Sequence, residues 1–243
     1  MVRFFVTSEQ LQQEQLVLTG ENAEHAKVLR LKEGEQVLLC DGQGMEAVCT
    51  VCAAGGGQFC LAVEGRQRSS SEARVRVSIY MAFPKADKLE HVIQKATELG
   101  AWEIVAFPTE RCISRPDDKS LKKKLERWQK IAESAAKQSG RGVIPRVTVL
   151  KSYREALERG KSTDLPILFY ENEHATTLRM ALSNAPYTSL ALLTGPEGGL
   201  EPQEVEQAKQ AGFHICTLGS RILRCETAPL CALSAVMYAS GEF

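Results

Sequence analysis

The chain of 243 residues lacks a long apolar run, an excess of charge of one sign and a leader-like N-terminus. No apolar stretch approaches the ~20 residues that a membrane-spanning helix needs, so no membrane association is expected. Lys and Arg together number 30, as do Asp and Glu, which excludes a generally basic protein but not a local basic face. The first ten residues contain no apolar core followed by a small-residue cleavage site, so a cytoplasmic location is expected.

The eight cysteines also lack the spacing that is typical of a metal site. Cys49 and Cys52 are three residues apart, as in many zinc sites, but Cys40 and Cys60 do not form the second close-set pair that such sites use. Cys49 lies in an alternating apolar run, where a cysteine serves as a small hydrophobe. The sequence therefore predicts no metal site and, for a cytoplasmic protein, no disulfide.

Residues 1–70 are predicted to form a small β-rich domain. Short apolar runs separated by glycine-containing turns suggest a small barrel, with one helix over residues 21–31 that turns Ala26, Val28 and Leu29 inward. The segment Gly42–Ala47 matches a dinucleotide fingerprint as a string, but an alternating strand follows it instead of a helix. It is predicted to be a hairpin turn.

A polar, serine-rich linker ends the first domain near residues 66–74, and residues 74–243 alternate strands with helices. Six strands are expected near residues 75–82, 102–107, 146–150, 166–170, 189–193 and 213–218. Periodicity alone predicts an unknotted, doubly wound α/β sheet. The last helix, residues 227–240, carries no charged side chain, which predicts either a core helix or a subunit interface.

Two glycine-containing loops follow strands of this predicted sheet and are the candidate site. The loop Gly195–Leu200 lacks the Lys-Ser or Lys-Thr of a phosphate loop and carries Glu197, which suits ribose hydroxyls or a positive centre. A structural turn before a helix is the alternative. The second loop, Leu218–Glu226, offers Arg221 and Arg224 to a phosphate or a base, and a surface Arg–Glu pair is its alternative.

Basic residues gather at two further places: on the helix of the small domain, around His25, Lys27 and Arg30, and along the helix expected over residues 121–138. Solvated faces explain most charge runs, but this concentration in a neutral protein makes RNA a candidate partner. None of the four histidines is predicted to be catalytic; His91 and His174 are expected on helices and His214 on a strand.

These motifs resemble a known family. Gly195-Pro-Glu-Gly-Gly-Leu and Leu218-Gly-x-Arg-Ile-Leu-Arg-x-Glu-Thr-Ala are similar to the two cofactor loops of the 16S ribosomal RNA (uracil-N3) methyltransferases, the ribosomal RNA small subunit methyltransferase E family of the SPOUT superfamily. Three further segments agree with this resemblance: His25-x-x-x-Leu-Arg; Lys95-x-x-Glu-Leu-Gly with Glu110-Arg-Cys; and Lys130-Ile-Ala with Gln138-x-Gly-Arg.

The resemblance implies a fold and an activity. The fold would be an α/β trefoil-knotted SPOUT methyltransferase domain preceded by a small PUA-like RNA-binding β-barrel, acting as a homodimer. The activity would be S-adenosylmethionine-dependent methylation of N3 of a uridine in 16S rRNA, free or in the small ribosomal subunit. A SPOUT enzyme for another RNA position, a non-catalytic RNA-binding protein of the same fold, and a small-molecule nucleotide enzyme are the alternatives.

Site residues carry over by position. Arg224 would stabilise charge on the uracil oxygens, and Glu226 or Glu197 would be the base, with proton loss to water as the alternative. The cofactor site would comprise Thr194, Gly195, Glu197, Gly198, Gly199, Leu218, Gly219, Ile222, Leu223, Arg224, Thr227 and Ala228. RNA contacts would come from Arg3, His25, Lys27, Arg30, Gln138, Arg141 and Arg221.

Overall fold

The computed structural model describes residues 1–114, 118–183 and 186–243 and divides the chain into two compact units. One unit comprises Met1–Glu72 and Ala136–Ile144, and the other comprises Ala73–Ala135 and Pro145–Phe243. Within the described residues, no helix is both long and apolar enough to cross a membrane.

The smaller unit is built on a five-stranded sheet with the order β1-β3-β4-β5-β2. Its strands are β1 (Val2–Phe5), β2 (Gln15–Leu18), β3 (Gln36–Cys40), β4 (Met45–Gly55) and β5 (Gln58–Arg68). The turn between β3 and β4 confirms the hairpin predicted at Gly42–Ala47. In the described part of the chain β1 and β2 remain edge strands that do not pair with each other, so closure into a barrel stays a prediction.

Two helices belong to this unit, α1 (Ser8–Leu11) and α2 (Gly20–Val28). Periodicity missed α1, which is too short for a repeat but carries a capping box between Thr7 and Gln10. Ala26 of α2 is buried as predicted, whereas Val28 and Leu29 are 79% and 41% exposed, so their inward placement was wrong. The helix ends at Val28, where the 3.6-residue repeat no longer fixes which way a side chain faces.

The larger unit is organised around a six-stranded parallel sheet with the order β11-β9-β10-β6-β7-β8. These strands are β6 (Arg76–Ala82), β7 (Glu103–Phe107), β8 (Arg146–Val149), β9 (Leu165–Phe169), β10 (Ser189–Thr194) and β11 (His214–Cys216). All six predicted strands are present. The nearly continuous burial of β6, β9 and β10 is typical of central strands covered on both faces.

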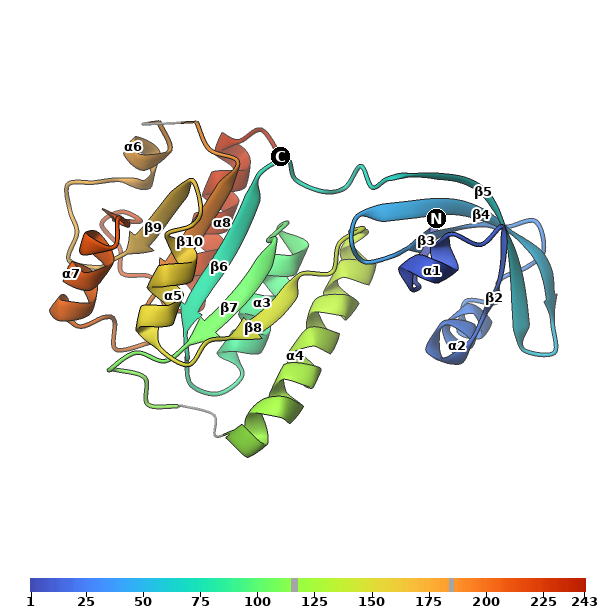
Figure 1. Ribbon diagram of the computed structural model, residues 1–243, viewed down its shortest axis with the longest axis horizontal. Helices are drawn as coiled ribbons and strands as arrows, with labels where there is room; N and C mark the ends of the chain where they lie inside the picture. The colour runs from blue at the N-terminus through green and yellow to red at the C-terminus, as the bar shows by residue number, and fades with distance from the viewer. Residues whose placement is uncertain (115–117, 184–185) are drawn as a thin grey trace. The chain divides into compact units, whose positions relative to one another are not determined.

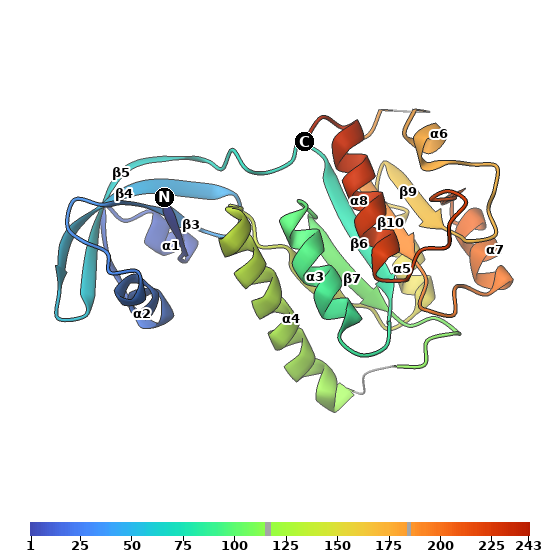
Figure 2. The same ribbon diagram turned by 180° about the vertical axis from the view of Figure 1, so that it is seen from behind.

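In the described ranges this sheet is accompanied by the helices α3 (Lys88–Glu98), α4 (Asp118–Ser139), α5 (Tyr153–Gly160), α6 (Leu178–Ser183), α7 (Pro202–Gln210) and α8 (Thr227–Ala239). α3 and α8 cover one face and α5 lies on the other (Figures 1 and 2). α3 buries Leu89, Val92, Ile93 and Ala96, the apolar face that the sequence predicted. α6 begins only at Leu178, so His174 lies in a loop and not on the predicted helix.

The apolar helix α8 packs on α3, α6, β6 and β10. Pro229, Leu233 and Val236 are among its buried residues, but a stripe at spacings of three and four residues stays exposed: Cys231, Ala235, Tyr238 and Ala239. Burial on all sides, as in a core helix, was therefore a wrong expectation for the single chain. The exposed stripe is an apolar surface that none of the described residues covers.

Candidate functional site

The loops that follow β9, β10 and β11 meet at one edge of the parallel sheet and enclose a cavity of about 690 Å³. Because β9 lies between β10 and β11, the carboxyl ends of these three strands are adjacent. The topology reverses beside them, since β7 and β8 lie on one side of β6, whereas β10, β9 and β11 lie on the other. Open α/β sheets bind ligands at such a place, and the volume suits a nucleotide-sized molecule.

Nearly all of the predicted cofactor residues line this cavity. Both glycine loops contribute, together with Pro196, Ser220, Arg221 and Cys225, and Ala228 lies at the start of α8. Among the predicted cofactor residues, Thr227 alone lies outside the described lining. Glu226, which was predicted to be catalytic, lies outside it as well. Ile222 is 87% exposed although it lines the cavity, so its apolar side chain lies at the rim.

Sequence reasoning missed several lining residues, most of them in the segment after β9: Lys88, Phe169, Tyr170, Glu171, Asn172, His174 and Thr217. That segment has no glycine cluster and no motif. Its place beside the site follows from strand order, because β9 pairs with both β10 and β11.

Lys88, at the start of α3, connects the two glycine loops. Its Nζ atom lies 3.0 Å from Oε1 of Glu197 in the first loop and 3.2 Å from Oε2 of Glu226 in the second. It also donates to the Sγ atom of Cys225 at 3.7 Å, while the amide of Lys85 donates to Glu197 at 3.0 Å. One ammonium thereby holds together two loops that are far apart in sequence.

This cluster sets the charge of its members. Partial burial opposes ionisation of Glu197, but hydrogen bonds from backbone amides and from Lys88 hold its pKa below the ordinary value. Burial opposes ionisation of Glu226 as well, yet its own backbone amide, Cys225 and Lys88 lower its pKa. Burial raises the pKa of the Cys225 thiol to about 12. At neutral pH the cluster is therefore a lysine cation between two carboxylates, with a protonated thiol.

The first glycine loop is closely packed around its backbone. A Cβ on Gly195 would lie 3.1 Å from the carbonyl carbon of Gly199. Gly199 has φ of +68°, and a Cβ there would overlap the carboxylate of Glu171. Arg111 braces the outside of the loop, donating from Nη1 to the Gly198 carbonyl and from Nε to Glu201, both at 2.8 Å. Only glycine fits this combination of backbone angle and close neighbours.

One buried hydroxyl in the cavity has no hydrogen-bond partner among the described residues. Thr194, at the end of β10, is 2% exposed, and its Oγ1 atom makes no hydrogen bond in the described structure. Thr148 is the other described residue with such a hydroxyl, and it does not line the cavity. Since buried polar groups are rarely left unsatisfied, the Thr194 hydroxyl is a position where a bound ligand can supply the missing partner.

The predicted RNA-contacting residues fall into two groups. Arg3 and Arg141 have carboxylate partners inside the smaller unit: Arg3 pairs with Glu46 at 3.0 Å, and Arg141 pairs with Glu72 at 2.6 Å. The side chain of Arg141 is only 5% exposed. The others are exposed, namely His25, Lys27 and Arg30 at and just after α2, Gln138 on α4, and Arg221 at the cavity.

No group of three or more His, Cys, Asp or Glu side chains in the described ranges is arranged to hold a metal ion. Cys40 and Cys49 are buried, and burial raises the pKa of each thiol to about 11. Both cysteines are core residues, as the alternating run predicted for Cys49.

The site and fold define an α/β domain with a ligand pocket at the carboxyl edge of its sheet, and comparisons with known proteins place it in a class. Residues 71–237 match the model of the RNA methyltransferase domain, and residues 18–64 match that of the RNA methyltransferase PUA domain. This chain is therefore an RNA methyltransferase with an α/β methyltransferase domain and a PUA domain.

Whole-chain relatives narrow the class. The chain is 39% identical to ribosomal RNA small subunit methyltransferase E of Bacillus subtilis over 98% of its length and 96% of the relative's. It is 35% identical to the Mycobacterium bovis protein of the same name, over 90% and 85% of the two chains. A Neisseria gonorrhoeae protein of that name, solved bound to S-adenosyl methionine, superposes with a TM-score of 0.87 at 31% identity over 98% of both chains. The chain belongs to the ribosomal RNA small subunit methyltransferase E family.

Proposed function

We propose that the protein transfers a methyl group from S-adenosylmethionine to N3 of a specific uridine in 16S ribosomal RNA, in the cytoplasm. Family membership supports the class of reaction, and the cavity at the carboxyl edge of the sheet supports the binding of a nucleoside-bearing donor. The single observation that carries the donor site is the unpartnered, buried hydroxyl of Thr194 inside that cavity.

The residues present fit the donor. Gly195 and Gly199 leave bare backbone where an adenine ring can approach closely. Glu171 places a carboxylate against Gly199, at the wall of the cavity. A carboxylate accepts well from a ribose diol and attracts a positive centre. We propose that Glu171 receives the ribose hydroxyls of the donor, beside the predicted residues of the two glycine loops.

The chemistry demands orientation and the loss of one proton. When bound, the donor supplies a methyl group on a sulfonium centre, and N3 of uridine must lose its proton as it is alkylated. Arg224 has no carboxylate partner in the described chain and is exposed at the cavity rim. Its planar guanidinium can donate to the uracil oxygens and stabilise the negative charge that develops there. Arg221, also exposed at the rim, is free to contact a neighbouring phosphate.

The surroundings of Glu226 favour a positioning role over that of general base. Its carboxylate is held by Lys88 and Cys225, and its lowered pKa makes it a weak proton acceptor at neutral pH. Glu197 is held by the same lysine. We propose that both carboxylates fix the glycine loops through Lys88, and that the imide proton, acidified by Arg224, leaves to water.

RNA recognition is assigned to the domain predicted over residues 1–70, which lies within the smaller unit and is proposed to be a PUA-like barrel. His25, Lys27 and Arg30 are exposed on α2 and just after its end, and Lys27 forms an exposed pair with Glu24 at 3.3 Å. Residues 74–243 form the proposed methyltransferase domain. Arg3 and Arg141 are better explained as structural residues, because both guanidiniums are neutralised inside the unit.

The proposal also includes a homodimer and a knotted chain. The exposed apolar stripe of α8 suits a second copy of the same helix, which supports a homodimer. Family membership supports a trefoil knot formed by the segments around the two glycine loops. The substrate is either free 16S ribosomal RNA or the assembled small subunit, and the assembled subunit would cover more of the protein surface.

Calorimetric titration with S-adenosylmethionine and S-adenosylhomocysteine, followed by mass-spectrometric mapping of methylated 16S ribosomal RNA, tests this function. We expect one donor site per chain and one N3-methyluridine in the product. Binding of the donor with methylation at another atom or nucleotide would favour a different RNA methyltransferase. RNA binding without donor binding would favour a non-catalytic protein of this fold.

A further inference from the structure

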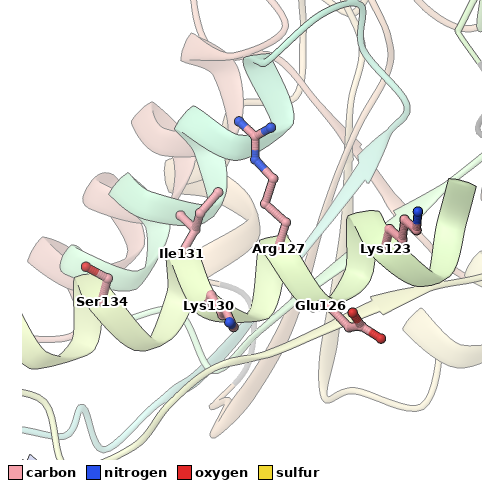
Figure 3. A pocket seen from close by; sticks show the side chains of 6 residues that line it. All are labelled: Lys123, Glu126, Arg127, Lys130, Ile131 and Ser134. Atoms are coloured by element: carbon pink, nitrogen blue, oxygen red, sulfur yellow. The ribbon is translucent and has the colours of Figure 1, made fainter. Parts of the chain in front are cut away.

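Helix α4 carries an exposed set of lysines that the proposed reaction does not use. They are Lys119, Lys122, Lys123, Lys124 and Lys130, here called the lysine face. None of the five forms an ion pair with a carboxylate in the described structure, whereas nearby Arg127 pairs with Glu90 of α3 at 2.6 Å. Figure 3 shows the contrast: the Arg127 side chain extends to α3, whereas the side chains of Lys123 and Lys130 do not reach that helix.

The placement of these charges opposes the stability of the helix. Lys119 and Lys123 are four residues apart and Lys119 and Lys122 three apart, so like charges face each other along one side of α4. Lys119 also lies in the first turn of the helix, where the positive end of the helix dipole disfavours a cation. A chain with no net charge has no general need for such a cluster. A charge arrangement that lowers helix stability is expected mainly at functional sites, so these lysines are candidates for a binding function.

The geometry matches an extended polyanion better than a single small anion. Lys119, Lys123 and Lys130 recur at helical spacing and span roughly 17 Å of helix at about 1.5 Å per residue. Lys123 and Lys130 border an open hollow of about 390 Å³, which also exposes the Ser134 hydroxyl and one acid, Glu126. A row of flexible ammonium groups around an open hollow can contact several phosphates but is too spread out to enclose one.

We propose that the lysine face is a second RNA-contacting surface, separate from the donor cavity, which holds the phosphate backbone of the substrate RNA without reading its sequence. The proposal rests on the proposed function, because it takes the substrate to be RNA. Phosphate contacts of this kind supply affinity and orientation while base contacts supply specificity. The lysine face would therefore strengthen binding to any RNA and leave the choice of uridine to the other surfaces.

The test uses the full chain with Lys122, Lys123 and Lys130 all changed to Gln. Glutamine keeps a similar helix propensity, so α4 is expected to stay folded. The control variant changes Lys151, Lys161 and Lys209, exposed lysines elsewhere on the same unit, to Gln and alters the net charge equally. Binding of transcribed 16S ribosomal RNA and of an unrelated RNA hairpin is measured by fluorescence anisotropy between low and moderate salt.

We expect the slope of log affinity against log salt to decrease in magnitude by about 2 in the lysine-face variant, for both RNAs, and to change little in the control. Equal slopes in wild type and variant would overturn the inference, as would an equal loss in the control variant. Loss of binding to anionic lipid vesicles with unchanged RNA binding would also overturn it. Titration with S-adenosylmethionine separates the two proposals: absence of donor binding in wild type contradicts the proposed function, whereas intact donor binding with equal RNA slopes contradicts only the lysine face.

Discussion

The Nζ atom of Lys88 lies 3.0 Å from Oε1 of Glu197, and the same ammonium lies 3.2 Å from the carboxylate of Glu226. A residue at the start of α3 thus fixes two loops that belong to different strands. The relationship explains how glycine-rich segments, which lose much entropy on ordering, keep one conformation around the cavity.

Replacing Lys88 by Met removes this connection, and we expect the affinity for S-adenosylmethionine to fall several-fold. In wild type both carboxylates have pKa values below the ordinary 4.5, so their contribution to stability is present above that value and lost as the pH falls through the lowered values. Without the ammonium, both pKa values move up toward the ordinary value, so less of the stability depends on ionised carboxylates. The melting temperature of the variant should therefore be lower than that of wild type at neutral pH and should fall less on acidification below pH 4.5. The same acid-induced fall in melting temperature in variant and wild type would contradict this role; Lys95→Gln, on the same helix, is the control.

The Thr194 hydroxyl is predicted to serve the ligand and not the fold. Changing Thr194 to Val removes a buried hydroxyl without a partner, so stability without ligand should be equal or higher. Donor affinity should fall by about 1 kcal/mol because a hydrogen bond to the ligand is lost. Thr148→Val, at the other described unpartnered hydroxyl, should affect stability in the same way and leave donor binding unchanged. Urea unfolding and calorimetry provide the two measurements.

Gly199 is predicted to be required for two reasons: its backbone angle is left-handed, and the Glu171 carboxylate leaves no room for a side chain. Alanine there meets a φ of +68° and the Glu171 carboxylate, whereas Gly212 has a φ of +94° with no neighbour within 4 Å. Both Gly→Ala variants should lose about 1 kcal/mol of stability from the left-handed backbone. Only Gly199→Ala should abolish donor binding. Equal binding by the two variants would show that Glu171 yields to the new methyl group and would weaken the assignment of this loop.

Glu72 is predicted to stabilise the smaller unit through the segment at Arg141. Its carboxylate accepts from the Arg141 guanidinium at 2.6 Å and from the amides of Gly142 and Val143 at 2.9 and 3.1 Å. Glu72→Ala leaves a buried guanidinium and two amides without that acceptor, which should cost about 3 kcal/mol. Glu24→Ala, which removes an exposed pair with Lys27, should change stability by less than about 0.5 kcal/mol. Chemical denaturation followed by circular dichroism compares the two.

Tyr238, 76% exposed on the apolar stripe of α8, is predicted to be buried between two copies of the chain. A glutamate there places a charge in an apolar interface, so Tyr238→Glu should shift the protein from dimer to monomer in sedimentation experiments. Val28→Glu, at a position of similar exposure on α2, should leave the dimer intact. A dimer that persists in Tyr238→Glu would place the interface elsewhere.

Much of the site was predictable from the sequence because its chemistry lies in local motifs. The segments Gly195–Leu200 and Leu218–Glu226 could be located by their glycines and by the apolar runs before them, and most residues of both line the cavity. Strands were predictable for a similar reason: buried parallel strands are short apolar runs, and β6, β9 and β10 all have that pattern.

Contacts between distant segments were not predictable. Nothing in the sequence around Lys88 relates it to Glu226, and nothing around Glu171 relates it to Gly199, because each pair is brought together by the strand order β11-β9-β10-β6. Tertiary structure likewise determined that Arg141 is buried against Glu72 and that one stripe of α8 remains exposed. The sequence by itself determined the elements, the glycine loops and the family. Tertiary packing decided which side chains pair with each other and which remain exposed, because both depend on which helices and strands become neighbours and not on the local sequence pattern.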